Sequence, residues 1–254
     1  MARVLRAAAS GALLLMLQGC AEAIPTACQT LFSAPNEVVS DGYVLRFVRT
    51  GPAADGCESA TPAETSDLWL FSTLAESVVA AHSVAMPFPE GEPAPAGLVG
   101  TGTFARPQVD SDGFCDIPSL STMTDDRSGT LLSYETRDMR FLGAPAYQSA
   151  EFEAKLTMTV GSCVAEYDVQ ALSPAVPCLD DSDCDPFRTP LSSGIPSGLD
   201  QGCTSEAWTA AVLEDLAATG YETTGICFLR QAFPSLKPGA STEGGLTVRP
   251  SSLR

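Results

Sequence analysis

The chain has 254 residues and a formal net charge of −17, with 31 acidic and 14 basic residues. A chain this acidic is repelled by nucleic acid and by anionic lipid head groups, so its surface is not expected to bind either. Hydrophobic residues make up 44% of the chain, which is enough for a folded core and excludes wholesale disorder. The 235 or so residues after position 19 fit one large domain, or a domain with an appendage.

The N-terminal residues predict export. Arg3 and Arg6 form a short basic region, and residues 7–17 form an apolar stretch of signal-peptide length. That stretch is shorter than the ~20 apolar residues that a membrane-spanning helix needs. It leads into Leu-Gln-Gly-Cys at positions 17–20, which resembles the lipobox of bacterial lipoproteins. The alternative is an ordinary secretory signal followed by a chance cysteine.

The lipobox resemblance implies that residues 1–19 are a signal peptide, removed before Cys20, and that Cys20 is then lipidated on its thiol and its new amino group. Removing residues 1–19 deletes two arginines and no acid, so the charge of −17 becomes about −19. Two or three acyl chains hold a protein on a membrane far more firmly than one. Ala21 follows the cysteine, and under the sorting rule of enterobacteria this favours the outer membrane. We expect a cell-envelope protein anchored through Cys20, with residues 20–35 as its tether.

The remaining eight cysteines predict four disulfides in an oxidising compartment. Local spacing suggests that Cys28 pairs with Cys57 and that Cys115 pairs with Cys163. A zinc site is the alternative, but no CxxC pair is present and the single histidine has no cysteine nearby. The eight positions are Cys28, Cys57, Cys115, Cys163, Cys178, Cys184, Cys203 and Cys227.

The strongest secondary-structure pattern is a hairpin at residues 152–171. Apolar and polar residues alternate from Phe152 to Val160 and again from Cys163 to Ala171. Gly161-Ser162 between them predicts a two-residue type II′ turn, which places Lys155 opposite Asp168 and keeps both apolar faces on one side.

Shorter patterns predict further strands. Short strands at this density, separated by turn signals, favour an antiparallel sandwich or barrel, and we expect a β-sandwich-like domain over residues 36–172. The segment 74–86 fits a helix or a strand equally well. The glycines at 100 and 102 indicate a bulge or a close approach of another backbone. The other expected strands are 43–48, 68–71, 98–105, 114–117, 130–134 and 139–142.

The pattern changes after the hairpin. Residues 173–235 are expected to form a cysteine-rich segment with one α-helix at about 205–219, capped by Thr204 or Ser205 and ended by Gly220. Trp208, Val212 and Leu216 share one face of that helix. Residues 236–254 have no core-forming pattern and are expected to be disordered. The fold class is therefore mainly β, with a disulfide-rich appendage.

Acidic clusters are the candidate ligand sites. Asp180, Asp181 and Asp183 lie between two cysteines, and calcium prefers six to eight oxygen ligands. A second cluster, 110–113, is only part of an EF-type loop. The alternative for both clusters is a solvated turn in which aspartates cap backbone N–H groups. Apart from calcium we expect no cofactor.

No motif for catalysis is present. A catalytic triad or Cys-His pair has to use His82, the only histidine, and its neighbours match no catalytic motif. Gly100-Thr101-Gly102-Thr103 lacks the third glycine of a dinucleotide fingerprint. With 31 acidic residues, a carboxylate pair of the glycosidase kind is expected by chance alone.

The motif Cys178-x-x-Asp-x-Asp-Cys184 resembles a short cysteine-rich motif in predicted lipoproteins of the myxobacterial type. The resemblance covers residues 150–230, and no activity comes with it. We expect a non-enzymatic envelope lipoprotein that binds a protein or glycan partner. The alternatives are an envelope glycan hydrolase that uses a carboxylate pair and a calcium-stabilised adhesion module.

Overall fold

The computed structural model describes residues 27–30, 42–75, 77–83, 98–126, 129–147, 149–187, 193–205, 208–217 and 224–240. The predicted signal peptide, Cys20, most of the predicted tether and the proline-rich segment 87–95 lie outside the described residues. Within the described residues, no helix has the length and apolar character that a membrane crossing requires.

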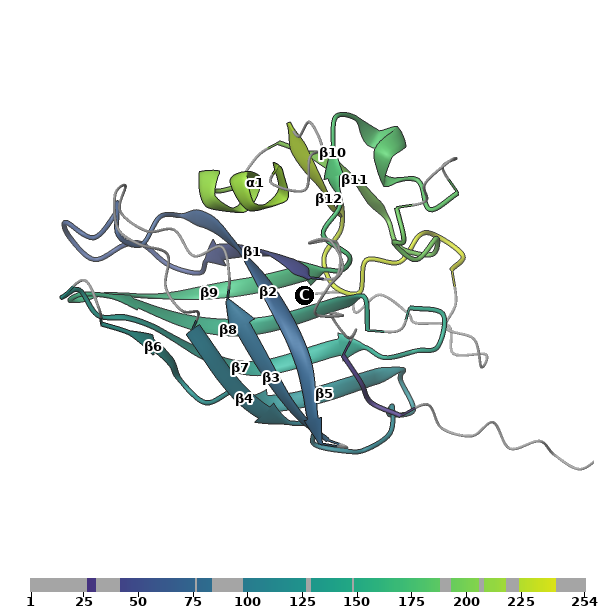
Figure 1. Cartoon of the computed structure of the whole chain (residues 1–254), viewed down its shortest axis with the longest axis horizontal. Coiled ribbons are helices and arrows are strands. Elements are labelled where there is room, and N and C mark those ends of the chain that lie inside the picture. Colours follow the sequence, from purple (N-terminus) through teal and green to yellow (C-terminus); the bar gives the residue numbers. More distant parts are fainter. Residues whose placement is uncertain are drawn as a thin grey trace, which may run out of the picture.

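Nine strands form one antiparallel sheet in the order β4-β3-β2-β1-β9-β8-β7-β5, with β6 paired to β7. In Figure 1, β2, β3 and β4 cross in front of β7, β8 and β9, so the two halves of this one sheet form two facing walls. The predicted mainly β, antiparallel fold is confirmed. The strands are β1 Tyr43–Arg49, β2 Glu64–Ala75, β3 Val78–Ser83, β4 Leu98–Thr103, β5 Phe114–Ser119, β6 Met123–Asp125, β7 Leu132–Leu142, β8 Glu151–Val160 and β9 Cys163–Leu172.

The sheet nearly closes on itself where β4 meets the segment after β5. Gly102 forms an antiparallel bridge with Leu120, and the Ser121 N–H donates to the Thr101 carbonyl at 2.7 Å. A Cβ on Gly100 would lie 2.7 Å from the Ser121 carbonyl oxygen, and one on Gly102 would lie 2.7 Å from Leu120. The predicted close backbone approach at these two glycines is therefore confirmed.

The hairpin of β8 and β9 has the predicted register. Met158 lies opposite Ala165, and Lys155 lies opposite Asp168 with an Nζ–Oδ1 distance of 2.5 Å. Gly161 has a positive φ of 61°, as the two-residue turn requires.

One sequence expectation is corrected, and one open choice is resolved. The separate strands at 130–134 and 139–142 are one strand, β7, whose pairing with β8 shifts register between Arg137 and Arg140. Asp138 has a φ of 53° at that irregularity, and a local bulge of this kind interrupts the alternation that sequence reading depends on. The ambiguous segment 74–86 contributes a strand, β3, because it pairs with both β2 and β4.

Aromatic rings fill the space between the two walls. Tyr43, Phe71, Phe141 and Phe152 pack with ring centroids 4.8–6.2 Å apart. Asp67 is buried beside them, where its carboxylate accepts hydrogen bonds from the Trp69 indole at 2.7 Å and from other donors. The interior of the sheet is thus a packed core with a satisfied buried carboxylate.

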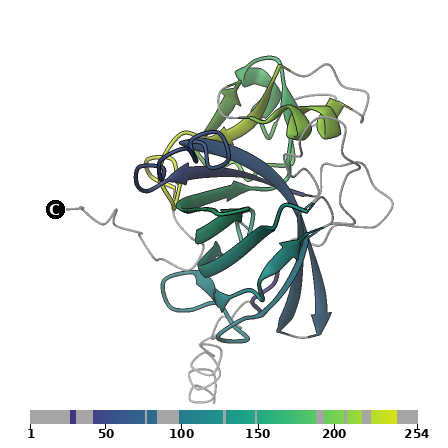
Figure 2. The ribbon, with the colours of Figure 1, turned by 90° about the vertical axis from the view of Figure 1, so that its left-hand side faces the viewer.

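The cysteine-rich segment forms a cap over the outer side of β1, β2 and β9 (Figures 1 and 2). A second hydrophobic core joins Val44, Leu68 and Leu172 of the sheet to Val212, Ile226 and Phe228 of this segment. The cap contains a three-stranded antiparallel sheet, β10-β12-β11. Its elements are β10 Pro177–Cys178, the 3-10 helix η2 Asp181–Cys184, β11 Gln201–Thr204, α1 Ala210–Ala217 and β12 Gly225–Leu229.

The helix begins later than expected. Thr204 belongs to β11, and Thr209 precedes the first helical residue with its hydroxyl accepting from the Val212 N–H at 3.4 Å. The Thr209 N–H donates to Ser66 Oγ at 2.8 Å, so the same residue ties the helix to β2. Val212 is buried, while Gly220 and the side chain of Leu216 lie outside the described residues.

The start of the predicted disordered tail is ordered. Leu236 bridges to Leu199, and the Lys237 N–H donates to the Gly198 carbonyl at 2.9 Å. Residues 231–240 therefore form a strap along the cap and the sheet, and residues 241–254 lie outside the described residues.

Candidate functional site

The eight predicted disulfide cysteines form four bridges. The pairs are Cys28–Cys115, Cys57–Cys163, Cys178–Cys203 and Cys184–Cys227. The expected pairs Cys28–Cys57 and Cys115–Cys163 are wrong, because the bridges follow neighbours in space. The Cys28 N–H, for example, donates to the Pro107 carbonyl in the loop that leads into β5, the strand of Cys115. Two bridges brace the large sheet and two brace the cap.

The candidate site is the rim loop, defined as residues 179–187 of the cap. Asp180 caps η2 by accepting from the Ser182 N–H at 2.8 Å, and Asp183 completes a reciprocal capping box by accepting from the Asp180 N–H at 3.4 Å. Asp183 also accepts from the Leu179 N–H at 2.7 Å. Cys178 and Cys184, at the two sides of this turn, are both disulfide-bonded. The aspartates thus make a short acidic turn that is held rigidly at both ends.

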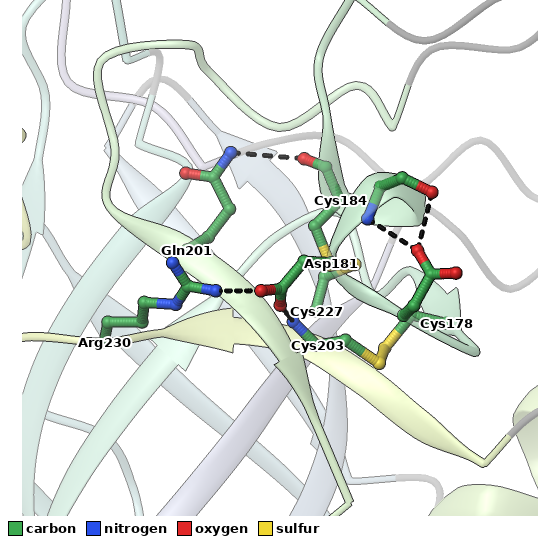
Figure 3. A network of polar contacts seen from close by, with 9 residues as sticks. Cys178, Asp181, Cys184, Gln201, Cys203, Cys227 and Arg230 are labelled. Atoms are coloured by element: carbon green, nitrogen blue, oxygen red, sulfur yellow. Dashed lines mark hydrogen bonds and ion pairs between the residues drawn. A yellow bond between two sulfur atoms is a disulfide. The ribbon is translucent and has the colours of Figure 1, made fainter.

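Asp181 has a different role from its neighbours. One of its oxygens accepts from the Cys203 N–H at 2.8 Å and the other lies 2.5 Å from Arg230 Nη2 (Figure 3). The Cys203 hydrogen bond, followed by the Arg230 guanidinium, holds the pKa of the Asp181 carboxyl below its usual range. Gly202 makes room for this pair, because a Cβ there would overlap the guanidinium.

The carboxylates of Asp180, Asp181 and Asp183 do not converge on one point. Among the described residues, the only three His, Cys, Asp or Glu side chains whose ligand atoms all lie within 4.8 Å of one another are Cys178, Cys184 and Cys227. All three of those sulfurs are in disulfides. The aspartates instead accept from backbone N–H groups, as the solvated-turn alternative expects.

The rim loop also exposes apolar side chains that the sequence patterns did not single out. Leu179 is 54% exposed and Phe187 is 77% exposed, the highest value among the large exposed hydrophobic residues of the described chain. The Phe187 N–H donates to Asp185 Oδ1 at 2.8 Å, which fixes the local turn. An exposed aromatic ring on a disulfide-braced turn is a typical anchor for a binding partner.

Other candidate residues have structural roles. Asp110 Oδ1 accepts from the N–H groups of Asp112 and Phe114, so the partial EF-type loop is an Asx turn. His82 lies in β3, with its partly buried side chain on the outer face of the sheet between β2 and β4.

Glu151 is a buried carboxyl with a strongly raised pKa. It is fully buried beneath the strap, and both of its oxygens accept from the Ser235 N–H at 3.0 and 3.1 Å. Burial raises the pKa of Glu151 to about 7, against the lowering effect of the Ser235 hydrogen bonds. A raised pKa suits a general acid, but this carboxyl is enclosed by the protein and braces the strap.

The fold and the site define an antiparallel β protein that is braced by disulfides. Its cap carries an acidic turn with exposed apolar side chains. The MlpA family model matches residues 48–174, which is half of the chain, and the chain belongs to the MlpA family. The match covers β2 to β9 and ends before the cap. No curated protein and no solved structure matches the chain.

Proposed function

We propose that this protein is a non-enzymatic envelope lipoprotein, anchored by lipid on Cys20, that binds a partner through its rim loop. The observation that carries the proposal is the rim loop itself, where exposed Leu179 and Phe187 stand beside carboxylates on a turn held by two disulfides. A rigid turn loses little conformational entropy on binding, which favours recognition.

The disulfide pattern supports export and lipidation. Cys28, Cys57, Cys115, Cys163, Cys178, Cys184, Cys203 and Cys227 pair among themselves, which leaves Cys20 as the remaining cysteine of the nine. Four disulfides fit an oxidising compartment, and the remaining cysteine is the one at the lipobox position.

The anchor is tested by Cys20→Ala. We expect the variant to move from the membrane fraction to the soluble fraction, while Cys20-containing protein stays with the membrane. Unchanged membrane association of the variant would contradict the lipid anchor. Mass spectrometry of the mature N-terminal peptide provides an independent readout, because acylation adds a defined mass.

The binding surface is tested by crosslinking in cells, followed by identification of the captured molecules. The double variant Leu179→Ser with Phe187→Ser should lose the partner that the unaltered protein captures. Val164→Ser is the matched control, because Val164 is 53% exposed on β9, outside the cap. Capture that is equally strong from the double variant would place the binding surface elsewhere.

Calcium at the rim loop is a second, more specific proposal. Carboxylates at 180, 181 and 183 are the ligand type that calcium prefers. Because they do not converge on one point and accept from backbone N–H groups, calcium binding requires the turn to rearrange. If calcium binds here, its addition raises the melting temperature, and the double variant Asp181→Asn with Asp183→Asn abolishes the rise. A melting temperature that does not respond to calcium removes this proposal and leaves the partner-binding proposal intact.

A further inference from the structure

The two disulfides of the cap lie side by side. Cys203 of β11 stands opposite Cys227 of β12, and Cys178 of β10 stands opposite Gly225 of the same strand. A Cβ on Gly225 would lie 3.2 Å from Cys203 Sγ, so the glycine makes room for the bridge. As a result the Sγ atoms of Cys178, Cys184 and Cys227 all lie within 4.8 Å of one another.

Residue exposure differs among these four cysteines. Cys178, Cys184 and Cys227 are 1%, 2% and 0% exposed, whereas Cys203 is half-buried. Among these four cysteines, Cys203 is therefore the one we expect an external thiolate to attack. In thiol–disulfide exchange the sulfur that is attacked keeps the attacking group and the other sulfur leaves as a thiolate. Attack at Cys203 releases Cys178, the sulfur that lies next to the second disulfide.

We propose that the cap is a thiol–disulfide exchange site in which a thiol from outside the protein bonds to Cys203 and the released Cys178 thiolate attacks the Cys184–Cys227 disulfide. In the first step the external S–Cys203 bond forms and the Cys178–Cys203 bond breaks. In the second step a Cys178–Cys184 or Cys178–Cys227 bond forms, the Cys184–Cys227 bond breaks, and the displaced thiolate takes up a proton. No electrons are gained or lost overall, so only a thiol is needed.

The exchange has a structural consequence for the rim loop. In the resting protein Cys184–Cys227 ties the end of η2 to β12. A Cys178–Cys184 bond removes this tie and closes a short ring around the acidic turn, and a Cys178–Cys227 bond releases Cys184 instead. Either product changes how the rim loop is held. The exchange site goes beyond partner binding and does not depend on it.

The chain contains its own matched control. Cys163 of the Cys57–Cys163 disulfide is half-buried like Cys203, and Cys57 is buried like Cys178. Among the described residues, however, no group of three neighbouring cysteine sulfurs includes Cys57. Attack at Cys163 is therefore expected to release a thiol that finds no second disulfide.

The test treats the oxidised full-length protein with reduced glutathione, then stops the reaction with acid and N-ethylmaleimide and maps every linkage by mass spectrometry. We expect glutathione on Cys203 together with a Cys178–Cys184 or Cys178–Cys227 linkage. At the control bridge we expect glutathione on Cys163 and N-ethylmaleimide on Cys57. The protein-thiol probe is thioredoxin with its second active-site cysteine replaced by serine. Adducts that form with this thioredoxin but not with glutathione identify a protein thiol as the partner.

Two results would overturn the proposal: a Cys203 adduct with Cys178 alkylated and Cys184–Cys227 intact, or no Cys203 adduct with either probe while Cys163 reacts. The double variant Cys184→Ser with Cys227→Ser removes the acceptor disulfide. In that variant Cys178 should be alkylated after attack at Cys203, without a new linkage. The unaltered protein supplies the decisive result even if the variant does not fold.

Discussion

Glu151 is the single residue with the clearest measurable effect on the pH dependence of stability. Its side chain is fully buried, and burial disfavours the charged form, which raises its pKa from the usual 4.5 of a glutamate to about 7. The folded protein therefore binds a proton at this site more tightly than the unfolded chain does. By linkage, the contribution of Glu151 to stability is full below pH 4.5, falls as the pH rises, and is lost above about pH 7.

Glu151→Gln should remove this pH dependence. The glutamine side chain stays neutral and its carbonyl still accepts from the Ser235 N–H, so the variant should be more stable than the parent protein above pH 7. The expected size of the effect is roughly 3 kcal/mol, from the shift in pKa. Chemical denaturation between pH 4.5 and 8 measures it.

Glu135→Gln, at an exposed position on β7, is the control for the loss of one acid. Parallel pH profiles for Glu151→Gln and the parent protein would show that Glu151 does not titrate in this range.

Among the individual elements, β4 depends on its glycines. A Cβ on Gly100 would lie 2.7 Å from the Ser121 carbonyl oxygen, which belongs to the backbone and cannot move aside easily. Gly100→Ala should therefore destabilise the fold by about 1–3 kcal/mol, the usual cost of overpacking. Gly51→Ala is the control, because nothing lies within 4 Å of a Cβ at that position. Equal stability of the two variants in denaturant would contradict a close approach between β4 and the segment after β5.

The helix of the cap depends on Thr209. The loss of its capping hydroxyl in Thr209→Ala should cost ~1 kcal/mol, whereas Thr209→Ser keeps a hydroxyl and should recover most of the stability. Thermal melts of the three proteins measure the difference. An alanine variant as stable as the serine variant would show that the hydroxyl does not cap α1.

At the scale of the whole molecule, the two parts should respond differently to reduction. The large sheet has an extensive aromatic core, while the cap depends on a smaller core and on Cys178–Cys203 and Cys184–Cys227. A native disulfide contributes ~2–4 kcal/mol, which is a larger share of the stability of a small unit than of a large one. Full reduction should therefore lower the melting temperature and open the cap first.

Hydrogen exchange with mass spectrometry distinguishes the two parts. After reduction, amides of β11 and β12 should lose protection before amides of β8 and β9 do. Simultaneous loss in all four strands would show that the cap and the sheet unfold as one unit.

Local patterns in the sequence were enough for the elements whose contacts are local. The β8–β9 hairpin was predicted with its register, because a two-residue turn and strict alternation leave one arrangement. The glycines at 100 and 102 correctly indicated a close backbone approach. The presence of a cap helix was predicted, but its start was not, since Thr204 and Thr209 are both acceptable caps until the pairing of β11 is known.

Local patterns were therefore sufficient to predict the mainly antiparallel β class, the central hairpin and a cysteine-rich segment with a helix. Tertiary structure decided the disulfide pairs, the closure of the sheet and the partners of the rim aspartates. The Asp181–Arg230 contact joins residues 49 positions apart, and the Cys57–Cys163 disulfide joins residues 106 positions apart. No local sequence pattern predicts contacts between residues so far apart. The physical reason is that turns and alternation act between neighbours, whereas these contacts depend on which surfaces the completed core brings together.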